Sequence, residues 1–141
     1  MRLAALLLAL VLAVGDPHSG RFQPRVTTTD WVNTYRARHD RPALVLNRTM
    51  SKCAKVHADE MMGAGRIFHS DPDDLAACLP EGWTLGGENV GVGAHVPEVL
   101  RAFARSRPHR RNLLRARYDY LGVGIVRDDS GAWVVLTFAD A

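Results

Sequence analysis

Residues 82–93 have the sequence GWTLGGENVGVG. Valine alternates with glycine after Glu88, a period of two that predicts a half-buried β-strand, and the glycines permit a bulge or a close backbone approach. A carboxylate is unexpected in such a strand, and two interpretations of Glu88 stay open. It either points from the strand end into a cleft, or it accepts backbone N–H groups and holds a loop in place, as Asn89 beside it could also do.

The segments around this strand predict helices first and a β-hairpin last. We expect a first helix capped by Thr29 or Asp30 and a second that runs from Asn47 or Thr49 to Gly63 or Gly65. An Asp- and Pro-rich loop should follow over 66–82, and a third helix should begin at Pro97 and be ended or broken by Pro108. The chain should close with a hairpin formed by YLGVGIV, the turn RDDSG and AWVVLTFAD. This order predicts an α+β fold with an antiparallel sheet.

The start of the chain predicts a secretory signal peptide over residues 1–15. Arg2 precedes an uncharged apolar stretch that ends in small residues, with cleavage expected after Gly15. The stretch is too short to cross a bilayer, so we expect no transmembrane segment after cleavage; an uncleaved anchor is the alternative. Residues 16–28 are polar and contain two prolines, which predicts a flexible leader before a single domain at 29–141.

The two cysteines, Cys53 and Cys78, are predicted to form a disulfide, because an even pair in an exported chain most often does so. The bond would close a loop of about 25 residues and stabilise the fold by about 3 kcal/mol. Two free buried thiols are the alternative. Neither cysteine lies in an activating motif, so we do not expect a thiol nucleophile.

Charge is concentrated in residues 101–117, which contain Arg101, Arg105, Arg107, Arg110, Arg111, Arg115 and Arg117. We call these seven residues the arginine cluster. It favours anionic surfaces such as phospholipid or acidic cell-envelope polymers, although a solvated helix face has the same composition. A net charge of +3 and the lack of interleaved aromatic residues argue against a nucleic-acid partner.

Three short segments could carry chemistry: FHS at His69, GGENV at Glu88 and SRPHRRNLL at His109. Each lies beside Gly, Ser or Pro near the end of an element, where side chains converge on clefts. His57 differs, because it shares a helix face with Cys53. We expect His57 to be a buried, hydrogen-bonded structural residue rather than a ligand.

Taken in order, these segments resemble the CAP superfamily of cysteine-rich secretory, antigen 5 and pathogenesis-related proteins. The resemblance rests on VNTYRARHDRPALVLNRTM, CAKVHADEM, FHS, GENV, SRPHRRNLL and the closing LGVGIV and WVVLTFAD. It covers about residues 29–140 and is strongest toward bacterial, exported members. It implies a three-layer α–β–α sandwich with a small antiparallel sheet, and we expect a secreted monomer. Arg36 also matches a family position and is expected to anchor the first helix by hydrogen bonds.

The resemblance further implies a shallow central cleft lined by two histidines and acidic residues, where some members bind a divalent metal. Here the histidines are His69 and His109, with Glu88 close by. The second acid of the family follows an aromatic residue by three positions; Phe103 takes the aromatic position and Ser106 that of the acid. The set of four cleft residues is therefore incomplete.

The incomplete set bears on metal binding. Zinc prefers neutral imidazoles with a further ligand, and carboxylates that orient the rings. His69 and His109 could hold zinc with Glu88 as third ligand, or Glu88 could only fix the tautomer of one imidazole. Ser106 cannot supply the missing charge, so we do not expect stable occupancy.

Three functions follow from these observations. We favour a non-catalytic secreted domain that binds a ligand such as a lipid or sterol, or a partner, through the cleft. The second is a metal-assisted hydrolase acting on peptide bonds, with Glu88 as general base toward metal-bound water. The third is a module whose arginine cluster docks an anionic envelope polymer or a membrane surface.

Overall fold

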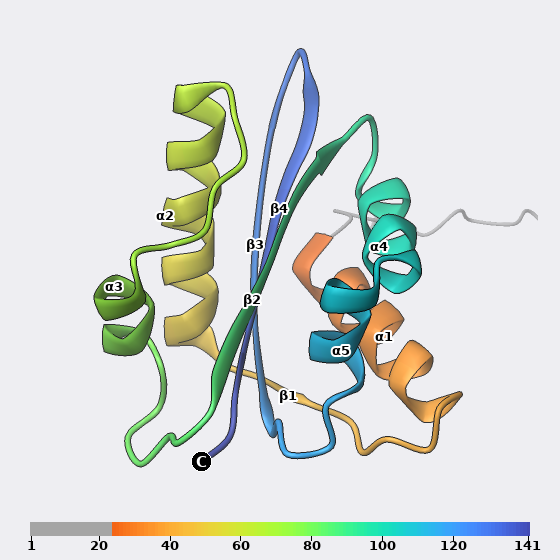
Figure 1. The fold of residues 1–141 in the computed structure, drawn as a ribbon. Coiled ribbons are helices and arrows are strands. Elements are labelled where there is room, and N and C mark those ends of the chain that lie inside the picture. The colour runs from red at the N-terminus through yellow and green to blue at the C-terminus, as the bar shows by residue number, and fades with distance from the viewer. Residues whose placement is uncertain (1–23) are drawn as a thin grey trace, which may run out of the picture.

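A computed structural model describes residues 24–141, which form a four-stranded sheet covered by helices on both faces (Figure 1). The helices are α1 (Pro24–Ala37), α2 (Arg48–Ala64), α3 (Pro72–Ala77), α4 (Val96–Arg105) and α5 (Arg107–Leu114). The strands are β1 (Val45–Leu46), β2 (Gly86–Gly93), β3 (Tyr120–Asp128) and β4 (Gly131–Ala139). Helix α2 covers one face and α1, α4 and α5 cover the other, so the predicted three-layer α–β–α sandwich is confirmed.

The sheet has the strand order β1-β3-β4-β2. Strands β3 and β4 form the predicted terminal hairpin, and β2 pairs antiparallel with β4 so that Glu88 lies opposite Thr137. The sheet is antiparallel, as expected, except at one edge, where β1 pairs parallel with β3. The chain crosses from α1 to α2 along that edge, and two residues suffice to form the ladder there.

Side chains on β4 alternate between two apolar layers. Leu136 and Phe138 pack with α1, α4 and α5, whereas Trp133 and Val135 pack with α2. Three of these four are fully buried, and Trp133 is 4% exposed. The strand therefore lies at the centre of the fold and carries the core on both of its faces.

Helix α2 begins and ends as its sequence predicts. The side chain of Asn47 accepts a hydrogen bond from Met50 N, and Gly65 ends the helix in the left-handed region at φ 65°. The helix lies directly against β3, where a Cβ at Gly124 would collide with the backbone of Ala54. Glycine at this position allows the close packing of helix on strand.

Two expected loops are partly helical. Residues 24–28 belong to α1 rather than to a flexible leader, because Pro24 suits the first turn of a helix and Thr28 is buried. Within the expected loop at 66–82, the side chain of Asp71 accepts from Asp73 N and starts the short helix α3. The predicted signal peptide and the rest of the leader lie outside the described residues.

The predicted disulfide is confirmed: Cys53 of α2 is bonded to Cys78 at the end of α3. Pro108 also behaves as predicted, since α4 ends before it and α5 begins around it. Within residues 24–141, no helix combines the length and apolar character needed to cross a membrane.

Candidate functional site

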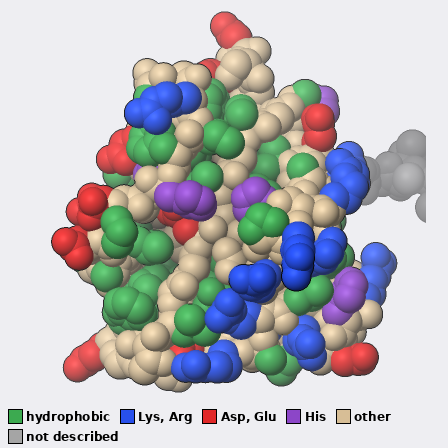
Figure 2. Space-filling view, viewed as in Figure 1, with side chains coloured by type: hydrophobic (Ala, Val, Ile, Leu, Met, Phe, Trp, Pro, Cys, Tyr) green, Lys and Arg blue, Asp and Glu red, His purple; other side chains and the backbone are tan. Residues whose placement is uncertain are grey.

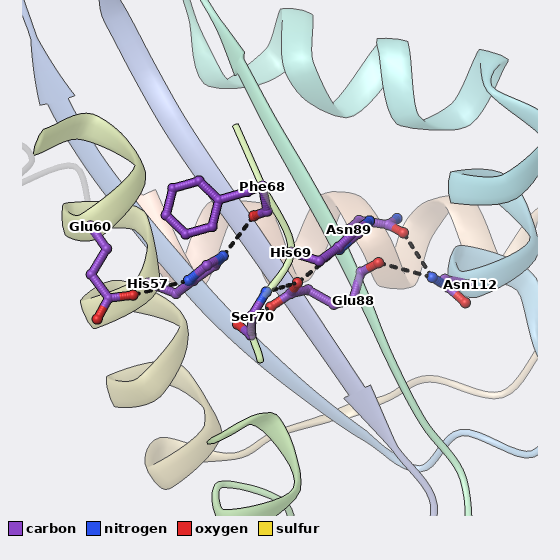
Figure 3. A network of polar contacts seen from close by, with 8 residues as sticks. All are labelled: His57, Glu60, Phe68, His69, Ser70, Glu88, Asn89 and Asn112. Atoms are coloured by element: carbon purple, nitrogen blue, oxygen red, sulfur yellow. Dashed lines mark hydrogen bonds and ion pairs between the residues drawn. The ribbon is translucent and has the colours of Figure 1, made fainter. Parts of the chain in front are cut away.

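Glu88 is a buried carboxylate on β2 that faces the loop between α2 and α3 (Figure 3). Its Oε1 accepts hydrogen bonds from His69 Nδ1 at 2.9 Å and from Ser70 N at 2.9 Å. Its Oε2 accepts from the hydroxyl of Ser70 at 2.6 Å. The carboxylate therefore accepts a backbone N–H and holds the loop in place, as one interpretation of the sequence expected, and it also orients the ring of His69.

The bond to Glu88 fixes the tautomer of His69. Because a carboxylate can only accept, Nδ1 of His69 carries the proton. In the neutral ring Nε2 then has a free lone pair, and the side chain is 65% exposed. His69 thus presents a hydrogen-bond acceptor to solvent in a defined orientation.

A pair of asparagines ties α5 to β2 on the other side of Glu88. The amide of Asn112 donates to Glu88 O at 3.1 Å and to Asn89 Oδ1 at 2.9 Å (Figure 3). Asn89 Nδ2 in turn donates to His109 O at 3.1 Å. A Cβ at Gly87 would collide with the hydroxyl of Tyr118, so glycine lets the side chain of Tyr118 lie close to the backbone of β2. The network holds the backbone of His109 beside the strand that carries Glu88.

His109 is half-buried on α5, with its ring centroid 4.9 Å from that of Phe103. Burial lowers the pKa of His109, and a positive charge on His69 lowers it further. Figure 2 shows two histidine side chains exposed near each other in the middle of one face of the molecule. The structure therefore brings together His69, Glu88 and His109, and favours the neutral form of His109 at pH 7.

The sequence model of the CAP family, described as the cysteine-rich secretory protein family, matches residues 29–138. This chain belongs to the CAP family. It is 28% identical over 104 residues to the uncharacterized protein YkwD of Bacillus subtilis, which covers 70% of this chain and 40% of that protein. The chain thus spans about 40% of the length of this curated relative.

Solved structures have the same fold. An extracellular protein containing a SCP domain from Bacillus anthracis is 25% identical, with a TM-score of 0.68 over 82% of this chain and 40% of that chain. An outer surface protein of Borrelia burgdorferi is 19% identical, with a TM-score of 0.74 over 82% of this chain and 91% of that chain. The second likeness concerns the fold alone.

Ser106, at the position of the second acid of the CAP family, lies between α4 and α5 and is half-buried. No hydrogen bond joins its hydroxyl to His69, Glu88 or His109 within the described part of the chain. Its backbone carbonyl accepts from Arg110 N and so starts α5. Ser106 contributes a helix junction three residues before His109.

The donor set does not fit a zinc site with three protein ligands. Among residues 24–141 no three His, Cys, Asp or Glu side chains are grouped so that they could hold one ion. Glu88, for which a third-ligand role and a tautomer-fixing role were both open, already has hydrogen bonds to both of its oxygens. A site formed by His69 and His109 alone stays a prediction.

Two further expectations are confirmed. Arg36 is fully buried and donates to Pro42 O, Leu113 O and Arg115 O, so it anchors α1 to α5. His57 is 6% exposed, its Nε2 lies 2.8 Å from Phe68 O, and its Nδ1 lies 3.2 Å from a carboxylate oxygen of α2.

The arginine cluster divides into structural and free members. Arg110 donates to the carbonyls of Ala104 and Arg105, and Arg117 donates to Asp140 and Thr84. Arg115 is half-buried, and its guanidinium lies over the ring of Tyr118. The exposed members without a side-chain hydrogen bond or ion pair inside the described region are Arg101, Arg105, Arg107 and Arg111. In Figure 2, basic side chains gather around the position of α5. Four guanidinium groups are thus available to an anionic partner.

Proposed function

We propose that this CAP domain is an exported, non-catalytic binding module, with His69 and His109 contacting its ligand. The observation that carries the proposal is the state of Glu88, whose carboxylate is buried and accepts three hydrogen bonds. A general base needs a free oxygen within reach of the proton that it removes. Glu88 is instead suited to orient His69.

The chemistry of the two imidazoles restricts the ligand. His69 presents the lone pair of Nε2, and the lowered pKa of His109 favours its neutral form. Both rings can accept a hydrogen bond, so the cleft suits a ligand with hydroxyl or amide donors, such as the hydroxyl of a sterol or a peptide. Export is supported by the sequence of residues 1–15 and by the similarity to an extracellular protein containing a SCP domain.

Co-sedimentation with purified bacterial cell envelopes tests the binding. The wild-type protein is compared with the double variant that carries His69→Ala and His109→Ala. We expect the wild type to sediment with the envelopes and the affinity of the double variant for them to be about tenfold lower. Casein is incubated in parallel with and without zinc, and no cleavage is expected. Zinc-dependent cleavage that disappears in the double variant would show a metal-assisted hydrolase and overturn the proposal.

A second candidate function is docking to an anionic envelope polymer, favoured by the four free arginines. Replacing Arg101, Arg105, Arg107 and Arg111 by serine removes these charges, and the bound fraction should then fall while the double histidine variant still binds. Raising the salt concentration should release the wild type in this case, because exposed charges are screened. Retention lost only on arginine replacement would favour this function over the cleft.

A further inference from the structure

A cavity of about 730 Å³ lies between α2, α3 and the 68–71 loop, and His69 is part of its lining whereas His109 is not. From its lining we propose that this cavity binds a small amphiphile, a molecule with an apolar chain and an ammonium group. The volume lies in the range of about 300–1,000 Å³ that is usual for small-molecule sites. The cavity shares His69 and Ser70 with the cleft but is not lined by Glu88 or His109, and the inference does not rest on the proposed function.

Part of the cavity wall is apolar. Val56 of α2, Phe68 of the loop and Leu75 of α3 line it together with the Cys53–Cys78 disulfide. Val56 is 58% exposed, so its side chain offers apolar surface that a ligand in the cavity could cover. An alkyl chain placed there would remove this apolar surface from water and be stabilised by about 25 cal/mol per Å².

The walls are fixed before any ligand arrives. His57 donates from Nε2 to Phe68 O and packs edge-on against the ring of Phe68, with centroids 5.1 Å apart (Figure 3). The disulfide joins the other end of the cavity, because it ties α3 to α2. A preformed cavity avoids the ordering cost that a flexible one would add to binding.

The charged residues of the lining decide the head group. The lining contains three carboxylates, those of Glu60, Asp71 and Asp74, and one ammonium group, that of Lys52. Asp71 caps α3 and the carboxylate of Glu60 lies beside His57. Asp74 is exposed and has no hydrogen bond or ion pair from its side chain among the described residues, which leaves it free to pair with a cation.

The distribution of charge over the molecule agrees with this choice. Figure 2 shows acidic side chains on the side of α3 and basic ones around α5. An anionic amphiphile would be repelled at the cavity and attracted to the arginine cluster, whereas a cationic one is attracted to the cavity alone.

Calorimetric titration with dodecyltrimethylammonium, below the concentration at which it forms micelles, tests the proposal on residues 16–141. Sodium dodecanoate serves as the anionic probe of the same chain length. We expect the cationic probe to bind at least about tenfold more tightly, the effect of one favourable ion pair at a partly desolvated site. Backbone amide chemical shifts should change in residues 52–78 and not in α5.

Matched variants locate the site. Asp74→Asn should weaken cationic binding several-fold, whereas Asp73→Asn, on the same helix but outside the lining, should not. Val56→Lys places a charge in the cavity and should abolish binding; Val45→Lys alters an equally exposed valine on β1 and should not. Absence of cationic binding, equal affinity for both probes, or equal effects of Asp74→Asn and Asp73→Asn would overturn the proposal.

His109→Ala separates this proposal from the function of the cleft. His109 does not line the cavity, so amphiphile affinity should stay unchanged in this variant. Envelope retention through the cleft should fall in the same variant. Each proposal can therefore fail without the other.

Discussion

At the scale of single residues, Glu88 shows why a buried carboxylate persists in a strand of valines and glycines. Three donors compensate its burial, and two of them come from the backbone and hydroxyl of Ser70. Neither Ser70 nor Asn112 stood out in the sequence. The signal was present, since Ser70 follows His69 directly and Asn112 is one helical turn after His109.

Replacing Glu88 by glutamine should therefore destabilise the fold. Glu88→Gln keeps the shape but turns one acceptor into a donor, and the charge-assisted bonds to Ser70 and His69 weaken. We expect a loss of about 1–3 kcal/mol in the free energy of unfolding, measured by urea denaturation. Glu81→Gln, an exposed glutamate in the loop before β2, is the control. Equal effects of the two changes would contradict this account.

His109 should make stability depend on pH. Its pKa in the folded protein is lowered by burial and by His69, so below about pH 6.5 the unfolded chain binds the proton more readily. The stability that the folded protein gains by holding His109 neutral is therefore fully present above this pH and is lost as the pH falls. We expect the free energy of unfolding to decrease from pH 7.5 to 5.5, with a shallower slope in His109→Gln. If the free energy of unfolding of His109→Gln depended on pH as steeply as that of the wild type, another group would cause the pH dependence.

At the scale of elements, α3 depends on one covalent bond. It has six residues and none of them is buried, so packing alone gives it little stability. Replacing Cys53 and Cys78 by serine should lower the free energy of unfolding by about 3 kcal/mol and speed hydrogen exchange in residues 72–77 before the rest of the chain. If exchange in α3 stayed as slow as in α2, the disulfide would not be what holds the helix.

The elements also show which features the sequence can predict. Helix α2 and the terminal hairpin were predictable because caps, apolar periodicity and turn residues act locally. Strand β1 has two residues, and its ladder depends on β3, which lies far along the chain. The first turn of α1 was missed because Pro24 suggested a leader, whereas proline also suits a helix start. His69, Glu88 and His109 stood out by their positions near element ends, and the family resemblance suggested that they share a cleft, but the contacts of Glu88 needed three-dimensional neighbours.

At the scale of the whole molecule, one guanidinium joins segments far apart in sequence. Arg36 of α1 donates to Pro42 O, Leu113 O and Arg115 O, although the last two lie 77 and 79 residues away. Burial lowers the pKa of this side chain. Its hydrogen-bond partners are three backbone carbonyl oxygens, whereas a buried guanidinium is more often paired with a carboxylate. The α1 layer is thereby attached to the end of α5, which also carries His109 and Asn112.

Arg36→Lys tests how much the fold depends on this contact. A lysine keeps the charge but cannot reach carbonyls in three directions with a planar fork, so buried acceptors lose their donors. We expect a loss of about 2–3 kcal/mol in the free energy of unfolding. Arg38→Lys, an exposed change two residues further along, should stay within about 0.5 kcal/mol of wild type. Because α5 is attached through Arg36, amide shifts of His109 and Asn112 should also change in Arg36→Lys. Loss of stability without such shifts would mean that the cleft is held by the asparagine network alone.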